Sequence, residues 1–589
     1  MKKKEIIICS ILIFIAACLF AAIIITDNIS ENNPAGSTDK VQMNVPTAGT
    51  DGNNTATAEP TVAPTPEPTP LPLIHATHVD ESNPDKYGLS SNIRHNDDDI
   101  SSYNREDKIF FDLGSDYNQI NGIPTFRGNN YRNTAGAFGT INITEQKFSD
   151  DYLYTITTDH MMGKNNYWSG IGWSGQAVAA EWPKETRQIM GMYDWAKEQD
   201  TLVEVISASQ DGCIYFYELE TGKATRDKID IGFPFKGGGA LDPRGLPLLY
   251  VGSGDQLQDG SRPAAYIINL ITNEKIYEFG KSDSFATRRT GWCAFDSSPI
   301  VDAETDTLIW PGENGVIYFV DLNTNYDKAN GTISINPDIV KFNFDCDKHE
   351  ERGGRTSFWH GMENSVIAYQ EYIYIADNAG ILICLNVNTL EVEWVQDLLD
   401  DTNCTGVLEI EDGKPYIYMS TAYHYGWRST NTTEEIPVWK INAENGEIVW
   451  RTDFMCKTTS SSSGGAQGSL ALGEGQLDNM VFVPLCRTPD TWDGILVALN
   501  TKTGEVIWET QLNYYTWTSP SIIYDDDTGK GYIVTACATG YLYLIDGLTG
   551  EILDTKRLLE GTIEASPIVY NDVVILGTRD DKIHALRIK

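Results

Sequence analysis

Aromatic, acidic and amide side chains recur in turns that precede short segments of small and apolar residues. Indole rings beside carboxylates and amides can bind the face of a sugar, a peptide side chain or a cationic group. We predict a ligand-binding set at these turns, composed of Trp173, Gln176, Phe295, Asp296, Trp359, His360, Glu363, Asn364, Gln467, Trp517 and Glu564. The plainer alternative is that these side chains fill and hydrogen-bond a closed channel.

The sequence lacks the motifs of common catalytic and metal sites. The acidic runs 97–99 and 525–527 do not have the ligand spacing of a calcium loop. The glycine cluster 236–239 lacks the ending of a phosphate loop and is expected to be a tight entry into a strand. No nucleophile elbow leads into a helix, and no Cys/His cluster indicates zinc. We therefore expect no catalytic residue, no metal and no cofactor.

The elements that must position these side chains form an internal repeat. Residues 494–508, Gly-Ile-Leu-Val-Ala-Leu-Asn-Thr-Lys-Thr-Gly-Glu-Val-Ile-Trp, share their frame with residues 540–553, 438–450 and 380–394. Each copy is typical of a strand, a glycine turn and a short strand that often ends in Trp. Two more strands precede it, and the inner one often follows Ser-Pro, as at Ser298, Ser519 and Ser566. Four short strands repeated about every 50 residues predict a propeller blade, with the candidate side chains around one mouth of the axial channel.

The number of blades follows from the turn positions. Seven complete units are counted from Gly222, Asn273, Asn325, Leu390, Gly446, Gly504 and Gly550. An eighth unit starts at Ile563 and has three strands, so its outermost strand is missing. The alternating residues 152–156 lie before the first complete unit and can supply that strand. We predict an all-β fold, an eight-bladed propeller closed between N- and C-terminal strands.

The N-terminal region predicts attachment to a membrane. A basic flank, residues 1–5, precedes the apolar run 6–25, which is long enough to cross a hydrocarbon core of about 30 Å as a signal anchor. Alternatively, residues 15–18 form a lipobox, and Cys18 would be lipidated after cleavage. Residues 26–73 are expected to be a disordered Pro/Thr-rich linker, 74–120 a lead-in and 121–589 the propeller. The C-terminal domain is therefore expected outside the cell membrane, as a single-pass protein or as a lipoprotein.

Charge and cysteine content limit the partners. The formal charge of −39 would repel phosphate backbones, so nucleic acid is not expected as a partner. Eight cysteines follow residue 200, and their even number permits disulfides, although their irregular spacing indicates no pairing.

The repeat at residues 494–508 closely resembles that of pyrroloquinoline-quinone-like (PQQ-like) propellers. Residues 124–136, Pro-Thr-Phe-Arg-Gly-Asn-Asn-Tyr-Arg-Asn-Thr-Ala-Gly, resemble the opening motif of that family. The resemblance covers residues 120–589 and implies a function of one of two kinds. Some members are quinone- and calcium-dependent dehydrogenases, often with a disulfide between adjacent cysteines. Others are non-enzymatic, such as the propeller lipoprotein of outer-membrane protein assembly.

This chain departs from the enzymatic members. No two cysteines are adjacent, and neither the calcium ligands nor the catalytic Asp of the dehydrogenases can be placed by motif. We therefore expect a membrane-anchored extracytoplasmic propeller that binds or scaffolds, recognising protein or cell-envelope glycan. The alternative is a PQQ- and calcium-dependent alcohol or sugar dehydrogenase, and a purely structural spacer in an envelope complex is a third possibility.

Overall fold

The computed structural model describes residues 72–173, 175–286, 293–353, 361–426, 428–460, 462–558 and 562–589. They belong to one compact unit, Pro70–Lys589. The predicted anchor, the lipobox cysteine Cys18 and nearly all of the predicted linker lie outside the described residues. None of the helices in the described ranges is long and apolar enough to cross a membrane.

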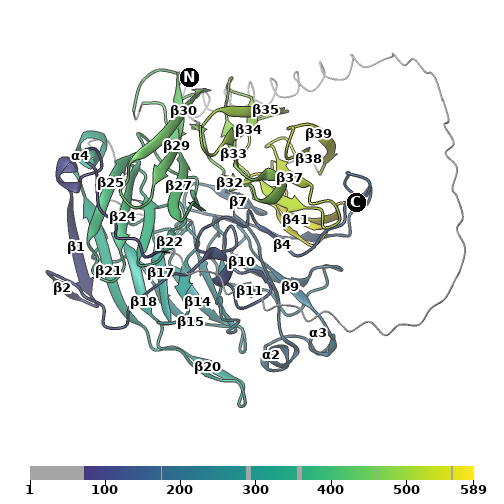
Figure 1. Cartoon of the computed structure of the whole chain (residues 1–589). Helices are drawn as coiled ribbons and strands as arrows, with labels where there is room; N and C mark the ends of the chain where they lie inside the picture. The colour runs from purple at the N-terminus through teal and green to yellow at the C-terminus, as the bar shows by residue number, and fades with distance from the viewer. Residues whose placement is uncertain are drawn as a thin grey trace, which may run out of the picture. The chain divides into compact units, whose positions relative to one another are not determined.

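The fold is an all-β, eight-bladed propeller with few helices, as the repeat predicted (Figure 1). Each blade is an antiparallel sheet of at least four strands among the described residues, ordered from the axis outward. The blades are β8 (Val178–Glu181), β9 (Val203–Ala208), β10 (Cys213–Glu218) and β11 (Ile229–Asp230); β12 (Ala240–Leu241), β13 (Leu248–Gly252), β14 (Ala265–Asn269) and β15 (Glu274–Phe279); β16 (Ile300–Asp302), β17 (Thr307–Pro311), β18 (Ile317–Asp321) and β21 (Asp338–Asp345); β22 (Ile367–Tyr369), β23 (Tyr372–Ala376), β24 (Ile381–Asn386) and β25 (Val392–Asp397); β26 (Val407–Glu411), β27 (Lys414–Ser420), β29 (Thr433–Asn442) and β30 (Ile448–Lys457); β32 (Ala471–Leu472), β33 (Met480–Cys486), β34 (Gly494–Asn500) and β35 (Val506–Leu512); β36 (Ser521–Tyr524), β37 (Gly531–Ala536), β38 (Tyr541–Asp546) and β39 (Ile552–Arg557); and β40 (Ile568–Tyr570), β41 (Val573–Thr578), β42 (Lys582–Arg587) and β5 (Tyr154–Thr157).

The eighth blade closes the ring in the predicted way. Strand β5 comes from the N-terminal side and pairs antiparallel with β42 near the C-terminus, with Tyr154 opposite Ala585 and Thr157 opposite Lys582. A single buried cluster joins blades 7, 8 and 1, and further clusters join each remaining pair of consecutive blades. The ring is therefore held by apolar packing between neighbouring sheets all the way round.

In several blades, a tryptophan on the outer strand contacts the following blade. The indole of Trp394 donates to the carbonyl of Ala443 at 2.9 Å, and that of Trp450 donates to the carbonyl of Thr501 at 2.8 Å. Each ring lies on a turn glycine, so that a Cβ added at Gly446 or Gly504 would stand 2.9 or 2.8 Å from the indole. These glycines have φ of 72° and 73°. The repeat therefore needs glycine for both its backbone conformation and its close contact with Trp.

A hydroxyl belt surrounds the channel where the inner strands begin. In six blades a Ser or Thr stands two residues before the inner strand, at Ser298, Ser365, Thr405, Ser469, Ser519 and Ser566. From Ser298 to Ser519, the amide of each residue donates to the hydroxyl of the next at 2.9–3.0 Å. The Ser-Pro signal in the sequence is thus a hydrogen-bonded contact between blades.

The axial segment, residues 122–138, contacts the inner strands of most blades and contains the opening motif. It begins with β3 (Gly122–Ile123), paired with β8, and ends with β4 (Ala137–Phe138), which runs parallel to β40. Between them, Arg132 donates to the carbonyls of Val366 at 2.9 Å and Ser298 at 3.1 Å. The arginine side chain is fully buried. The segment therefore ties blades 1, 3, 4 and 8 together near the axis.

The remaining elements decorate the ring. The lead-in adds β1 (Ser90–His95) and β2 (Asp98–Ile100) to the outer edge of β21, and Figure 1 shows β1 beside that blade. Asn325, counted as a turn residue, instead starts the inserted hairpin of β19 (Asn325–Asp327) and β20 (Thr332–Ser334), which lengthens the third-blade turn and corrects that assignment. The other elements are β6 (His160–Met162), β7 (Tyr167–Ser169), β28 (Ala422–Tyr423), β31 (Gly464–Gly465), the α-helices α2 (Lys184–Ile189), α3 (Asp194–Glu198) and α4 (Asp347–Gly353), and the 3₁₀ turns η1 (Pro84–Tyr87), η2 (Gly114–Asp116) and η3 (Gly475–Leu477).

Candidate functional site at the channel mouth

Turns from several blades meet at the end of the channel where the inner strands begin, which we call the mouth. Nine of the predicted ligand-binding residues lie in the described ranges, whereas Trp359 and His360 lie outside them. The structure assigns packing positions to two of the nine. Phe295 is 1% exposed and packs on the rings of Phe279, Trp310 and Tyr318. Asn364 is also buried, and its amide donates to main-chain carbonyls of the same blade and the adjoining turn.

The mouth cluster consists of Lys236, Asp296, Glu313 and Glu363. The three acidic residues each offer an oxygen within 4.8 Å of the others. The ammonium of Lys236 forms an ion pair with Asp296 and lies 3.6 Å from Glu313. It also lies 4.7 Å from the centre of the Trp173 ring. Four charged groups from consecutive blades are thus gathered beside an indole.

Burial and charge shape the protonation of this cluster. Burial raises the pKa of Asp296 well above its usual range, and the neighbouring Glu313 raises it further. Burial would lower the pKa of Lys236, but Asp296 and Glu313 reverse this effect and raise it overall. Lys236 therefore remains an ammonium ion, and its charge offsets part of the cost of burying the carboxylates around it.

A second acidic group continues the cluster into the next blades. The amide of Asn378 donates to Asp401 at 2.8 Å and to Glu363 at 3.2 Å. His424 lies 3.3 Å from Asp400 and 3.8 Å from Asp401. Burial, followed by the charge of Glu363, raises the pKa of Asp401 to about 8. The mouth therefore holds a largely buried group of acidic side chains, with one lysine and one histidine among them in the described turns.

An aromatic row extends from the mouth cluster toward solvent. The row consists of Trp168, Trp173, Trp517, Tyr515, Tyr514 and Trp492, whose successive ring centres lie 4.6–6.4 Å apart. Trp168 is 5% exposed, whereas Trp492 at the far end is 61% exposed. The guanidinium of Arg487 lies 4.4 Å from the centre of the Tyr515 ring. The row thus runs from a buried ring at Trp168 through partly exposed rings to an exposed ring at Trp492.

The other predicted residues surround these two groups. Glu564 forms an ion pair with Arg579 at 2.9 Å and accepts from the amide of Trp173 at 3.3 Å. Gln467 accepts from Asn403 at 3.1 Å. Gln176 is 5% exposed and accepts from the amide of Arg127 in the axial segment at 3.4 Å.

Several mouth residues were missed from the sequence, chiefly Lys236, Glu313, Asn378, Asp401 and His424. Lys236 was assigned to a tight strand entry, and the structure explains why glycines follow it. A Cβ added at Gly237 would stand 1.9 Å from the carbonyl oxygen of Asp296. Asp401 could have been found from its position in the sequence. It lies in the turn before β26, and other predicted residues likewise lie in turns before inner strands.

All eight cysteines of the described ranges are buried free thiols, so no disulfide joins them. Burial raises the pKa of Cys404 and of Cys486 to about 12. These thiols are therefore apolar fillers of the blades rather than reactive groups.

Comparisons with known proteins find relatives in sequence and in structure. A family model described as outer membrane protein assembly factor BamB matches residues 300–519 and 493–589. A protein with that description from Kangiella koreensis is 25% identical over 213 residues, which cover 35% of this chain and 46% of that protein. The chain spans half or less of the length of the curated relatives of this description that it matches, 46% and 50%.

Two solved structures are also similar. The structure of BamB from Moraxella catarrhalis is 16% identical, with a TM-score of 0.42, and the match covers 66% of this chain and 92% of that one. A quinohemoprotein alcohol dehydrogenase from Pseudomonas putida is 11% identical, with a TM-score of 0.48 and coverage of 80% of both chains.

Proposed function

We propose that this chain, a propeller of PQQ-like repeats that resembles the outer membrane protein assembly factor BamB, is a binding or scaffolding module at the outer side of a membrane. The ligand is a protein or a cell-envelope glycan, recognised at the channel mouth. The N-terminal residues 6–25 anchor the module, or Cys18 carries a lipid in their place. Residues 26–73 link the propeller to the membrane.

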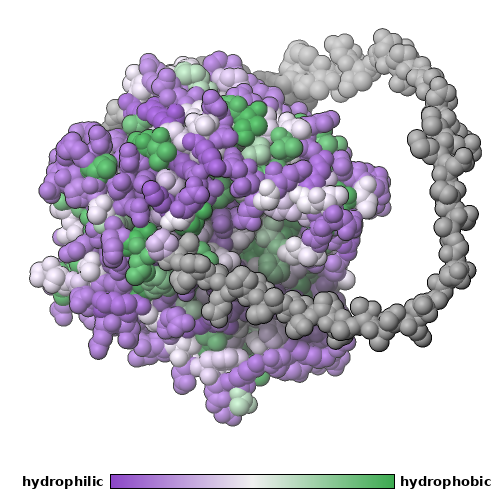
Figure 2. All heavy atoms as spheres, viewed as in Figure 1, coloured by the Kyte–Doolittle hydropathy of each residue, from purple (hydrophilic) through white to green (hydrophobic). Residues whose placement is uncertain are grey.

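The observation that carries this proposal is the aromatic row beside the mouth cluster. Exposed and half-exposed rings supply contact area at a low cost in conformational entropy, and they pack against sugar faces and peptide side chains. The neighbouring carboxylates and amides supply hydrogen bonds that orient a polar ligand. On the face that Figure 2 shows, the surface is mainly hydrophilic, with small, separate hydrophobic patches.

The alternative function, a quinone- and calcium-dependent dehydrogenase, needs a divalent cation among carboxylates. The three acidic residues of the mouth cluster are the group in the described ranges that could hold one. However, the ammonium of Lys236 already forms an ion pair with Asp296 and lies 3.6 Å from Glu313. A calcium ion there would face a buried positive charge at close range. The donor set does not fit calcium while Lys236 is present, so the observation favours the binding module.

The proposal is tested by measuring ligand binding to residues 70–589 and to three variants of this fragment. Retardation in gels that contain envelope polysaccharide reports glycan binding, and cross-linking in intact envelopes reports protein partners. We expect Trp517→Ala and Tyr514→Ala to weaken binding about ten-fold, which corresponds to about 1.4 kcal/mol. Tyr193→Ala is the matched control, because Tyr193 is 39% exposed on the N-terminal side of α3 and outside the mouth. Equal binding by all three variants would rule out the mouth as the binding surface.

A further inference from the structure

A separate pocket lies at the opposite ends of the inner strands from the mouth. Its walls include the axial segment and the residues that follow the inner strands of blades 6, 7 and 8, namely Glu474, Asp526 and Asn571. The mouth residues precede those strands, so the strands separate the two sites. The pocket encloses about 230 Å³. This is smaller than the roughly 300–1,000 Å³ typical of sites for drug-sized ligands, and it suits one side chain.

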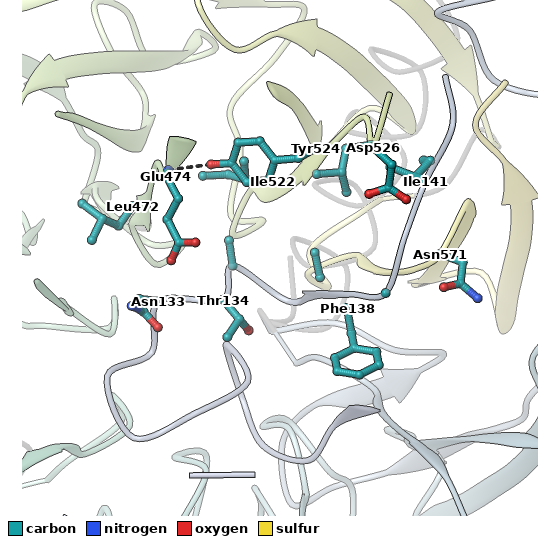
Figure 3. A pocket seen from close by; sticks show the side chains of 14 residues that line it. Asn133, Thr134, Phe138, Ile141, Leu472, Glu474, Ile522, Tyr524, Asp526 and Asn571 are labelled. Carbon is teal, nitrogen blue, oxygen red and sulfur yellow. Dashed lines mark hydrogen bonds between the residues drawn. The ribbon is translucent and has the colours of Figure 1, made fainter. Parts of the chain in front are cut away.

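Two carboxylates and an apolar floor line this pocket. Glu474 and Asp526 lie on opposite sides of it, as Figure 3 shows. Leu472 and Ile522 provide apolar surface, and Phe138 and Tyr524 provide aromatic surface. No lysine, arginine or histidine is among the lining residues.

The charges of the pocket are not compensated by the protein. Within the described ranges, neither Glu474 nor Asp526 forms an ion pair. Their main chains form hydrogen bonds: the amide of Glu474 donates to the Tyr524 hydroxyl at 2.6 Å, its carbonyl accepts from the amide of Leu477 at 2.9 Å, and the amide of Asp526 donates to the carbonyl of Ile141 at 2.8 Å. Burial raises the pKa of Glu474, and the charge of Asp478 raises it further. Both residues are exposed to solvent, so a cation that enters the pocket would gain two carboxylate partners that no basic side chain of the described ranges neutralises.

We propose that this pocket receives an arginine side chain presented by a partner protein. A guanidinium is planar and carries five donors, so it can pair with a carboxylate of the pocket while its face packs on an aromatic ring. The methylene stem would cover Leu472 and Ile522. The charge of the whole chain, −39, would also attract a basic partner over long range. This site is independent of the proposed role of the mouth.

Matched peptides test the proposal on residues 70–589. The probe is a short acetylated and amidated Gly-Arg-Gly peptide, and the control is the same peptide with citrulline, which keeps the shape and lacks the charge. Binding is followed by NMR titration of the pocket methyl groups. We expect saturable shifts with the arginine peptide and at least ten-fold weaker binding of the citrulline peptide. Equal binding of the two peptides would overturn the proposal.

Variants and a free ligand complete the test. We expect the double variant Glu474→Gln, Asp526→Asn to weaken binding of the arginine peptide at least ten-fold. Glu551→Gln, at an exposed turn of blade 7, should leave binding unchanged. Thermal unfolding of each variant confirms that the fold is retained. If free arginine binds as tightly as the peptide, the pocket is a small-molecule site and the partner protein is excluded from the proposal.

Discussion

At the scale of single residues, the buried ammonium of Lys236 is the most consequential feature of the mouth. Its side chain is 4% exposed, and the cluster around it holds three acidic residues. An ion pair this deeply buried contributes little net stability, but removing one partner leaves the others uncompensated. The lysine is therefore needed to compensate the charge of the buried acidic residues around it.

Replacing this lysine should destabilise the propeller strongly. We expect Lys236→Ala to lower the free energy of unfolding by about 3 to 5 kcal/mol, as measured by urea denaturation, because it leaves buried carboxylates without a cation. Lys184→Ala is the control, since its ion pair with Asp200 is exposed and should contribute little to stability. Similar losses in the two variants would contradict the importance of the buried pair.

A second residue-scale prediction concerns His349 in α4. Its ring lies 2.9 Å from Asp345 and 2.5 Å from Asp377. Burial lowers its pKa, but Asp377 and Asp345 reverse this effect and raise the pKa from 6.5 to about 11. The stabilisation is therefore complete below pH 6.5 and is lost as the pH rises toward 11.

The measurement is the free energy of unfolding from pH 6 to pH 10. We expect it to fall with rising pH, and the contribution of His349 has a limiting slope of about 1.4 kcal/mol per pH unit. His349→Gln should remove this contribution and flatten the profile. An unchanged pH profile in the variant would show that the histidine is not charged in the fold.

At the scale of elements, the closure of the ring depends on β5. Tyr154 takes the role that Trp has in later blades. Its ring stands 2.4 Å from a Cβ added at Gly222, and its hydroxyl donates to the carbonyl of Leu219 at 2.9 Å. The last blade is thus fastened to the first by the same kind of contact that joins blades 5 and 6.

Weakening this contact should loosen the closure selectively. We expect Tyr154→Ala to lower the free energy of unfolding by about 2 kcal/mol, because the ring is only half-buried, and Tyr154→Phe by about 1 kcal/mol. Hydrogen exchange of the β42 amides should become faster in Tyr154→Ala. Tyr541→Ala, in β38 of blade 7, is the control and should not affect these amides. Protection of β42 unchanged by Tyr154→Ala would mean that closure does not rely on this tyrosine.

At the scale of the whole molecule, the sequence predicted the architecture well. It predicted the residues of the site only in part. The frame of residues 494–508 is local, and its Trp and Gly have the same packing role in each copy, so the blades and the closing strand were predicted. Lys236 and Asp296 are 60 residues apart and meet only because blades 2 and 3 adjoin. The role of β1 on the edge of blade 3 depends on tertiary packing in the same way. No local sequence pattern predicts such contacts between distant residues.

The measurement that tests the central claim most directly is a calorimetric titration of residues 70–589 with pyrroloquinoline quinone in the presence of millimolar calcium. The account predicts no saturable heat, because the ammonium of Lys236 already pairs with Asp296 and Glu313, two of the three carboxylates that calcium would need. Binding in the micromolar range, followed by quinone-dependent reduction of an artificial dye, would contradict the binding-module function and establish the dehydrogenase in its place.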